Sequence, residues 1–233
     1  MNYIVLLIVL SAVFLIGFAL AFYEAVHIGK LSRRNIMWGL AGLLLFLAIL
    51  GLLYGLQLIG HTLASQITMI LYTLVSGFFL GGGTLNLKKR LNAGTLKYVN
   101  HTFMSDVLPN IISTLFIAYG LYKTDLFSSI PLSGLSVTSG ISLILLGFYG
   151  FTLKIVPEFR EEGILLLDRF IHWKDVLSFE WQYEQILDID YILPDRHISE
   201  FTTLVPLEDR KFVENLLNRK IEQHRPDSPI EEL

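Results

Sequence analysis

The sequence predicts a membrane-embedded α-helical bundle with five spans, followed by a small α+β domain whose antiparallel sheet is covered by one C-terminal helix. Composition is the first reason, because 53% of the 233 residues are hydrophobic and only 17% are charged. The charge distribution is the second reason. The residues before Lys154 include 8 Lys or Arg and 3 Asp or Glu, whereas the residues from Lys154 onward include 10 and 18, so the two parts carry +5 and −8. We therefore expect a transmembrane domain at 1–156, a water-exposed domain at 157–223 and a flexible tail at 224–233.

Five apolar runs account for the first domain. A helix rises 1.5 Å per residue, so about 20 apolar residues cross the hydrocarbon core of a bilayer. The first run has no Lys or Arg before it, which favours a retained helix over a cleaved signal peptide. The fourth run is short and carries Asn110, and its Pro109 falls in the first helical turn, where proline is tolerated. The predicted spans are 3–23, 36–59, 67–87, 107–122 and 135–156.

The connections between these runs alternate in charge and predict the orientation. They carry +3, 0, +4 and 0 in chain order, and the uncharged second connection is His61 to Gln66. Because Lys and Arg stay on the cytoplasmic side, we expect an external N-terminus and a cytoplasmic C-terminal domain at a bacterial inner membrane. Four spans would place one pair of connections on the wrong side. The basic residues are candidate contacts for anionic lipid or for the acidic domain: Lys30, Arg33, Arg34, Lys88, Lys89, Arg90 and Lys97.

Glycine pairs in the second and third spans are candidates for close helix packing. Gly51 and Gly55 form one GxxxG pair, and Gly77 and Gly81 form another. Such pairs let helix backbones approach closely, either in a homo-oligomer or, as we favour here, inside one bundle. The run Gly81 to Thr84 lacks the lysine of a phosphate-binding loop, so we interpret it as a loosened or kinked helix end.

The polar residues of the first domain do not form a recognisable reaction centre. No Arg, Lys or Asp falls inside the predicted hydrocarbon zone, which weakens an ion-coupled transport hypothesis. Glu24 and His27 lie three residues apart but lack a third metal ligand, so a solvated helix end is favoured. Asp106 most simply caps the fourth helix, and His101 has no assigned role.

The chain also lacks cysteine, which excludes disulfides, thiol catalysis and thiolate metal sites. The acidic C-terminal part argues against nucleic-acid binding, because phosphate contact needs a basic face. We expect no cofactor and no metal.

The C-terminal part alternates apolar and polar residues, as a half-buried sheet does. About four or five strands are expected between Gly163 and Val205, and an amphipathic helix follows Pro206. The candidate core combines aromatic and aliphatic positions: Trp173, Phe179, Trp181, Leu187, Ile189, Tyr191, Phe212 and Leu216.

Catalytic motifs in this part have simpler explanations. Asp188 and Asp190 match the DxD pattern of metal-dependent glycosyltransferases, but both fall on the polar face of one strand and no nucleotide-binding domain accompanies them. His172 and His197 lie in unrelated segments, so nucleophilic catalysis has no support.

The segments GILLLDRFIHWKDVLSFEWQ, ILDIDYIL and LVPLEDRKFVENLLNRKI resemble the short bacterial pleckstrin-homology-like domain that follows membrane helices in families of uncharacterised membrane proteins. The resemblance covers residues 158–223. It implies a partly closed antiparallel sheet capped by a helix, with protein contact or scaffolding as its role and no catalytic residue.

Three functional hypotheses follow. The first is a membrane scaffold or regulatory protein that holds the acidic domain at the inner membrane face, where it docks a protein partner. The second is a small transporter or transporter subunit that uses Asn110, Ser136, Thr138 and Ser142 at depth. The third is a membrane enzyme that acts on lipid through Glu24, His27, His101 and Asp106. The first is favoured.

Overall fold

The computed structural model describes residues 3–23, 33–101, 103, 107–127, 131–167, 169–193 and 196–224. They form two compact units. Unit 1 comprises Met1–Leu87 and Val107–Leu153, and unit 2 comprises Lys88–Asp106 and Lys154–Leu233. Unit 2 is therefore discontinuous, and it includes a segment that the sequence analysis assigned to a connection between spans.

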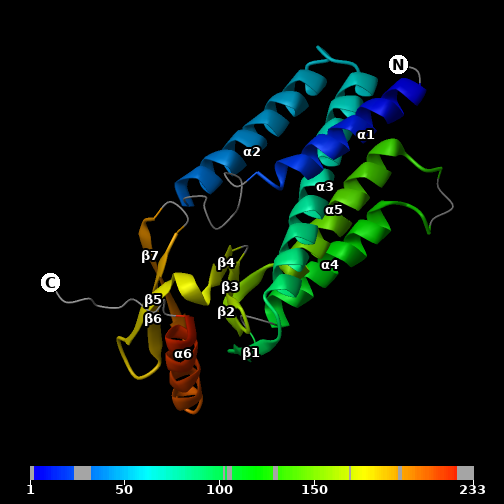
Figure 1. Cartoon of the computed structure of the whole chain (residues 1–233). Helices are drawn as coiled ribbons and strands as arrows, with labels where there is room; N and C mark the ends of the chain where they lie inside the picture. The colour runs from blue at the N-terminus through cyan, green and yellow to red at the C-terminus, as the bar shows by residue number, and fades with distance from the viewer. Residues whose placement is uncertain are drawn as a thin grey trace. The chain divides into compact units, whose positions relative to one another are not determined.

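Unit 1 is helical (Figure 1). Its helices are α1 (Tyr3–Leu20), α2 (Arg33–Gly55), α3 (His61–Asn92), α4 (Leu108–Lys123) and α5 (Gly134–Thr152). Among the described residues, α1, α3, α5 and the Met37–Gly55 part of α2 are long and apolar enough to cross a membrane. The remaining helix, α4, has only 16 residues.

Most helix boundaries differ from the expected ones by a few residues, and two of the differences are informative. Residues His61 to Gln66 were expected in a turn, but they form the first turns of α3, because this uncharged segment contains no helix breaker after Gly60. The fifth helix ends at Thr152 rather than at residue 156, and a strand begins at Lys154. The apolar Ile155 and Val156 made that strand look like the end of a span.

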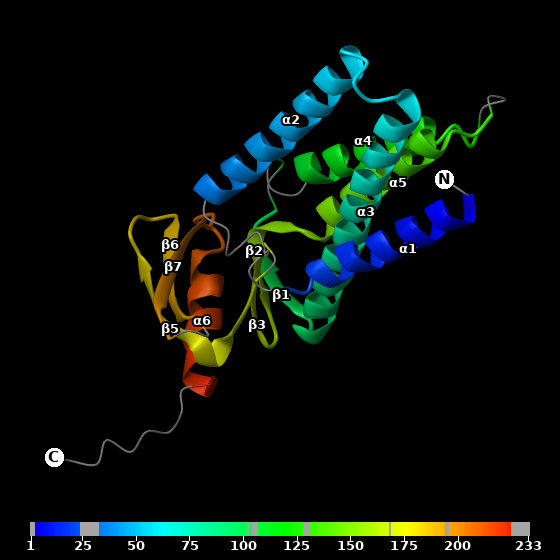
Figure 2. The ribbon, with the colours of Figure 1, turned by 90° about the horizontal axis from the view of Figure 1, so that it is seen from above.

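Close backbone approaches join the helices of unit 1. A Cβ atom added to Gly77 would lie 2.1 Å from the carbonyl oxygen of Phe14, and one added to Gly17 would lie 2.1 Å from that of Leu74. The α1 and α3 backbones therefore touch where glycine removes the side chain. Helices α4 and α5 run side by side (Figures 1 and 2) and approach in the same way, at Gly120 and Gly140.

The run Gly81 to Gly83 lies inside the continuous helix α3, so the expected loosened or kinked helix end is wrong. All three glycines are buried. A Cβ atom on Gly82 would meet the Tyr149 ring at 2.8 Å, and one on Gly83 would meet the Phe148 ring at 2.4 Å. Gly82 and Gly83 thus make room for aromatic rings of α5, whereas a Cβ atom on Gly81 would meet the backbone of Phe18 in α1.

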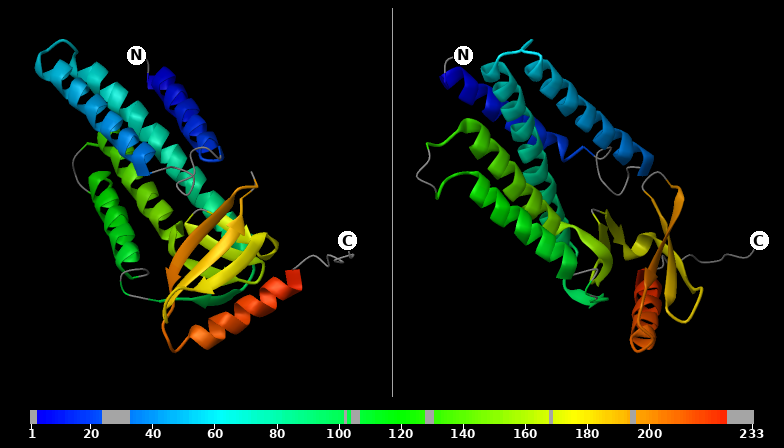
Figure 3. Two further views of the ribbon diagram at one scale, coloured as in Figure 1. Left: turned by 90° about the vertical axis from the view of Figure 1, so that its left-hand side faces the viewer. Right: turned by 180° about the vertical axis from the view of Figure 1, so that it is seen from behind.

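Unit 2 contains two antiparallel sheets and one long helix (Figure 3). The four-stranded sheet has the order β1 (Leu96–Val99), β2 (Lys154–Arg160), β3 (Gly163–Leu167), β4 (Arg169–His172). After the 3-10 turn η4 (Trp173–Asp175), the second sheet has the order β5 (Val176–Trp181), β6 (Ile186–Ile192), β7 (Ile198–Leu204). Helix α6 (Arg210–His224) follows.

The described residues of unit 2 form seven strands, more than the four or five that were expected. Strand β2 was partly assigned to the fifth span, and the four-residue β1 lies in what was expected to be a basic connection. Strand β1 pairs with β2 in antiparallel register, with Tyr98 opposite Phe159 and Val99 opposite Glu158. Because this pairing joins residues far apart in the chain, no local pattern predicted it.

The core of unit 2 is one cluster that includes residues of both sheets and of α6. Trp173 is fully buried, and its indole Nε1 donates hydrogen bonds to the carbonyl oxygens of Arg160 and Glu161, at 3.0 Å each. Leu187, Ile189, Tyr191 and Leu216 are also in this cluster, and Phe179 and Trp181 pack against it. Phe212 lies at the surface with 54% of its area exposed.

Candidate functional site

Seven charged residues gather in unit 2 where β1, β2 and α6 meet, and we refer to them as the ion cluster. Two are carboxylates on or just after β2, and five are cations from three separate segments. The members are Arg90, Lys97, Lys154, Glu158, Arg160, Glu161 and Lys220.

Glu158 is at the centre of the ion cluster and is only 2% exposed. Its Oε2 atom accepts from two nitrogens of Arg160, with Nε at 2.7 Å and Nη2 at 2.6 Å. Arg90 Nη2 lies 3.1 Å from the same carboxylate, and Lys154 Nζ lies 3.7 Å from it. Since a buried carboxylate is costly without partners, these cations make its burial feasible.

Arg160 also links the end of α3 to the sheet. Its Nη1 atom donates to the carbonyl oxygens of Gly94 at 2.8 Å and Arg90 at 3.3 Å. Gly94 has a φ of +75°, in the left-handed region where glycine is favoured at helix ends. The guanidinium thus satisfies carbonyl groups that the helix leaves unpaired.

Glu161 forms the second half of the ion cluster. Its carboxylate accepts from Lys220 Nζ of α6 at 2.8 Å, and it pairs with Lys97 of β1. The hydrogen bond from Lys220, followed by that from Lys97, lowers the pKa of Glu161 to about 2. Lys220 Nζ also donates to the backbone carbonyl of Glu161 at 3.0 Å. One acidic residue thus ties β1 and α6 to the turn after β2.

The five cations outnumber the two carboxylates by three, so the ion cluster has an excess of positive charge in an otherwise acidic domain. Two of the basic residues singled out from the sequence, Arg90 and Lys97, belong to it. Lys88 is exposed and Lys89 is partly buried nearby in the chain. Lys30 lies outside the described residues, as do the side chains of Arg33 and Arg34.

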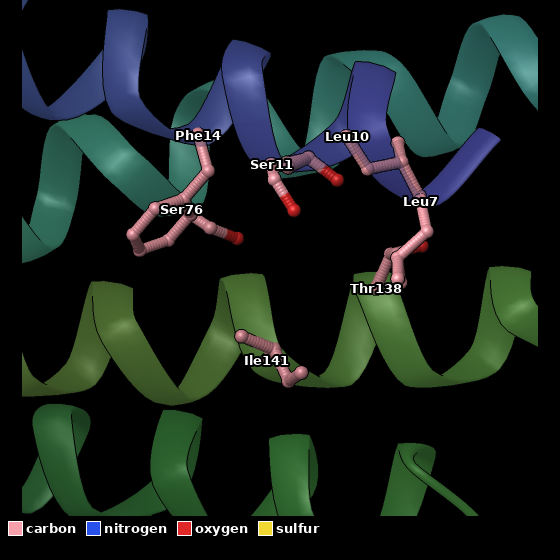
Figure 4. Close-up of a pocket in the computed structure, with 8 residues that line it drawn as sticks. Leu7, Leu10, Ser11, Phe14, Ser76, Thr138 and Ile141 are labelled. Atoms are coloured by element: carbon pink, nitrogen blue, oxygen red, sulfur yellow. The ribbon is translucent and has the colours of Figure 1, made fainter. Parts of the chain in front are cut away.

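Unit 1 contains a cavity of about 240 Å³ between α1, α3 and α5 (Figure 4). Apolar side chains and four hydroxyl groups line it: Leu7, Leu10, Ser11, Phe14, Thr73, Ser76, Thr138 and Ile141. Thr73, Ser76 and Thr138 each donate their hydroxyl proton to the carbonyl oxygen one turn earlier, at 2.7 to 2.9 Å. Their oxygens can therefore only accept further hydrogen bonds.

The glycine pairs from the sequence have different environments. Gly77 and Gly81 face α1, whereas a Cβ atom on Gly51 or Gly55 would meet nothing within 4 Å. The first pair therefore packs inside the bundle, and the second lies on an open face of α2.

The remaining candidate residues do not converge. Within the described part of the chain, no group of three His, Asp or Glu is placed to hold a metal ion. His172 ends β4 and His197 precedes β7, in different sheets. His101 is exposed after β1, and Glu24, His27 and Asp106 lie outside the described residues.

Sequence reasoning missed Glu158, Arg160, Glu161 and Lys220 as a group. A signal was present, because Pro157 to Glu162 (PEFREE) places four charges directly after a long apolar run. The burial of Glu158, Arg160 and Lys220 could not be inferred, since it depends on contacts between segments that lie 66 and 59 residues apart in the chain.

Residues 154–222 match a family model described as Domain of unknown function (DUF5673). The match covers β2 to β7 and nearly all of α6, but not β1. The curated proteins and the solved structures gave no match to the chain.

Proposed function

We propose that this chain is an integral membrane protein that holds unit 2, a pleckstrin-homology-like interaction domain, at the cytoplasmic face of a bacterial inner membrane. Its role is that of a scaffold or regulatory subunit that docks a protein partner. The observation that carries the proposal is the β1–β2 pairing, which makes unit 2 from two segments that flank the α4–α5 helix pair.

The pairing constrains how often the chain crosses a bilayer. Strands β1 and β2 must lie on the same side, so the chain between Val99 and Lys154 crosses an even number of times. If α5 spans, α4 spans with it, which supports five spans over four and agrees with the alternation of basic connections. At 16 residues α4 is about 24 Å long, so it crosses a core of about 30 Å only with local thinning of the bilayer.

The connections between the two units are short. Only Leu153 separates the end of α5 from the start of β2. Helix α3 continues without a break to Asn92, and three residues separate it from the start of β1 at Leu96. Two antiparallel sheets capped by a C-terminal helix support the pleckstrin-homology-like interpretation. The excess cations of the ion cluster suit anionic lipid head groups near the bilayer surface.

The cavity in unit 1 favours one alternative, a small transporter or transporter subunit. Its hydroxyl oxygens would accept hydrogen bonds from a small, mostly apolar ligand that carries a donor group. Of the residues expected to matter for transport, Thr138 lines this cavity. Under this alternative, Thr138→Ala abolishes flux at normal protein level, and under the scaffold proposal it does not.

The partner is tested by site-specific photo-crosslinking in cells with the full-length protein. A crosslinking amino acid is placed at Ile198, exposed on β7, and as a control at Leu115, exposed on α4. The scaffold proposal predicts a discrete protein adduct from Ile198 and mainly lipid adducts from Leu115. Protein adducts from Leu115 alone, or none from either position, would contradict it.

A further inference from the structure

The outer face of the β5-β6-β7 sheet carries four carboxylates, and we refer to it as the acidic face. Leu187, Ile189 and Tyr191 of β6 point into the core, so the residues that alternate with them point the other way. Asp188 and Asp190 are therefore on the outer face, and the register places Glu180 of β5 and Glu200 of β7 beside them. No Lys or Arg occurs in any of the three strands.

The register sets like charges directly opposite each other. Glu180 faces Asp188 across the β5–β6 pair, and Asp190 faces Glu200 across the β6–β7 pair. Such cross-strand pairs destabilise a sheet, whereas opposite charges at the same positions would stabilise it. The relief that the described residues provide is a hydrogen bond of 2.8 Å from the Ser178 hydroxyl to Asp190 Oδ2. The free protein therefore bears a repulsion that a bound cation would remove.

Asp188 supplies a second, independent observation. It is only 6% exposed, and its Oδ1 atom is buried without a hydrogen-bond partner. A buried polar atom without a partner costs free energy and needs an explanation. Here the explanation is a donor that arrives with a ligand.

The surroundings of the carboxylates indicate the kind of ligand. No three acidic or histidine side chains of the described residues are placed to hold a metal ion, so the charges suit a larger cation. Aliphatic pairs flank them, with Ile192 opposite Ile198 at one end and Ile186 opposite Leu204 at the other. Ile186 is partly buried, and the other three side chains are exposed. A planar guanidinium is weakly hydrated and pairs well with carboxylates, which makes arginine the fitting donor for Asp188.

We propose that the acidic face binds a segment of a partner protein in which arginines are flanked by apolar residues. The carboxylates receive the arginines, and the aliphatic pairs receive the apolar residues on either side. This inference rests on the proposed function, because it names the surface through which unit 2 docks its partner.

The test is fluorescence anisotropy with the full-length protein in detergent micelles. The probe is a labelled peptide with two arginines two residues apart, flanked at the same spacing by leucines. The control peptide carries neutral citrulline in place of arginine. The double variant Asp188→Asn with Glu200→Gln is compared with Glu214→Gln with Glu222→Gln, which removes the same charge from α6.

We expect the acidic-face variant to weaken binding of the arginine peptide at least about tenfold and the α6 variant to change it less than about twofold. The inference would be overturned if the two double variants bound the arginine peptide equally well. It would also be overturned if the wild-type protein bound the citrulline peptide as tightly as the arginine peptide. Displacement of the peptide by calcium at about equimolar concentration would also overturn it, because the face would then be a metal site.

Thermal unfolding separates a binding role from a structural one. Since Asp188 faces Glu180, Asp188→Asn is expected to leave Tm unchanged or to raise it. A fall in Tm would mean that this carboxylate belongs to the fold, which contradicts the inference. If the adduct from Ile198 forms but survives the acidic-face substitutions, the scaffold proposal stands and this docking surface fails. If no adduct forms in the wild-type protein, the proposed function fails, whatever the peptide does.

Discussion

The two units place their large apolar side chains in opposite ways. In unit 2, Trp173, Phe159 and Leu187 are fully buried, as in an ordinary water-soluble core. In unit 1, the buried positions are mostly small or hydroxyl-bearing residues such as Gly77, Ser76 and Ser113, and leucines and isoleucines cover the outside.

If unit 1 lies in a bilayer, as proposed, a different force stabilises each unit. Lipid is as apolar as leucine, so helices in a bilayer gain little from burying leucine and associate through close backbone contact. Unit 2 gains from removing apolar surface from water and must pair each charge that it buries. Substitutions at the close helix contacts of unit 1 should therefore act by steric clash. Substitutions in the ion cluster of unit 2 should act by leaving a buried charge unpaired.

The largest effect is expected for Glu158→Gln in the ion cluster. The substitution leaves Arg90, Arg160 and Lys154 without their shared carboxylate, and unpaired buried charge costs about 3–5 kcal/mol. Chemical unfolding, followed by tryptophan fluorescence of unit 2, measures the change. Glu222→Gln is the control, because Glu222 is exposed on α6. Equal stability of the two variants would show that the ion cluster is not needed for the fold.

The next effect is expected for Gly77→Leu in unit 1. The new side chain would meet the backbone of Phe14, which cannot move away alone, so a loss of about 1–3 kcal/mol or more is expected. Gly51→Leu is the matched control, since nothing lies within 4 Å of its Cβ position. The measurement is thermal unfolding in the same detergent. A similar loss for both variants would mean that the α1–α3 contact has no special role.

A smaller effect is expected for Tyr98→Phe on β1. The Tyr98 hydroxyl donates to Asp209 Oδ2 at 3.0 Å, and partial burial followed by this hydrogen bond raises the pKa of Tyr98. Loss of one such hydrogen bond costs about 1 kcal/mol, while the ring keeps its contacts with Phe159 and Phe212. Tyr183→Phe, at an exposed turn position, should leave the free energy of unfolding unchanged. Equal free energies of unfolding for Tyr98→Phe and Tyr183→Phe would contradict a stabilising role of this hydrogen bond.

The smallest effect concerns pH and Glu161. Its folded pKa of about 2 lies below the ordinary glutamate value of about 4.3. The carboxylate thus stabilises the fold fully above the ordinary value, and this contribution is lost as the pH falls from about 4.3 towards 2. Thermal unfolding between pH 6 and 2 should show a smaller decline in Tm for Glu161→Gln than for the wild type. Parallel curves would contradict this role of Lys220 and Lys97.

The sequence predicted the apolar helices, the later strands and α6 because their patterns are local. Period-two alternation marked β6, and a charged helix with one apolar stripe marked α6. The sequence did not predict β1, because four residues in a basic connection are too few to show the alternation of a strand. The continuous helix through Gly81 to Gly83 was missed for a related reason, since the rings of Phe148 and Tyr149 that occupy the space come from another helix.

The candidate site was predicted only in part. Clustered basic residues drew attention to Arg90 and Lys97, and the resulting contacts are with Glu158 and Glu161. The cavity of unit 1 and the burial of Asp188 arise where separate elements meet, so neither has a signature in the sequence.

The most direct test of the account uses cysteine accessibility, because the chain contains no native cysteine. Single cysteines replace Asn92, Asn218, Leu58 and Phe127, all exposed, and a membrane-impermeant maleimide is applied to intact and to opened cells. The account predicts that Leu58 and Phe127 positions react in intact cells and that Asn92 and Asn218 positions react only after opening. Labelling of the Asn92 and Asn218 positions from opposite sides, or of the Phe127 position from the same side as Asn92, would contradict it.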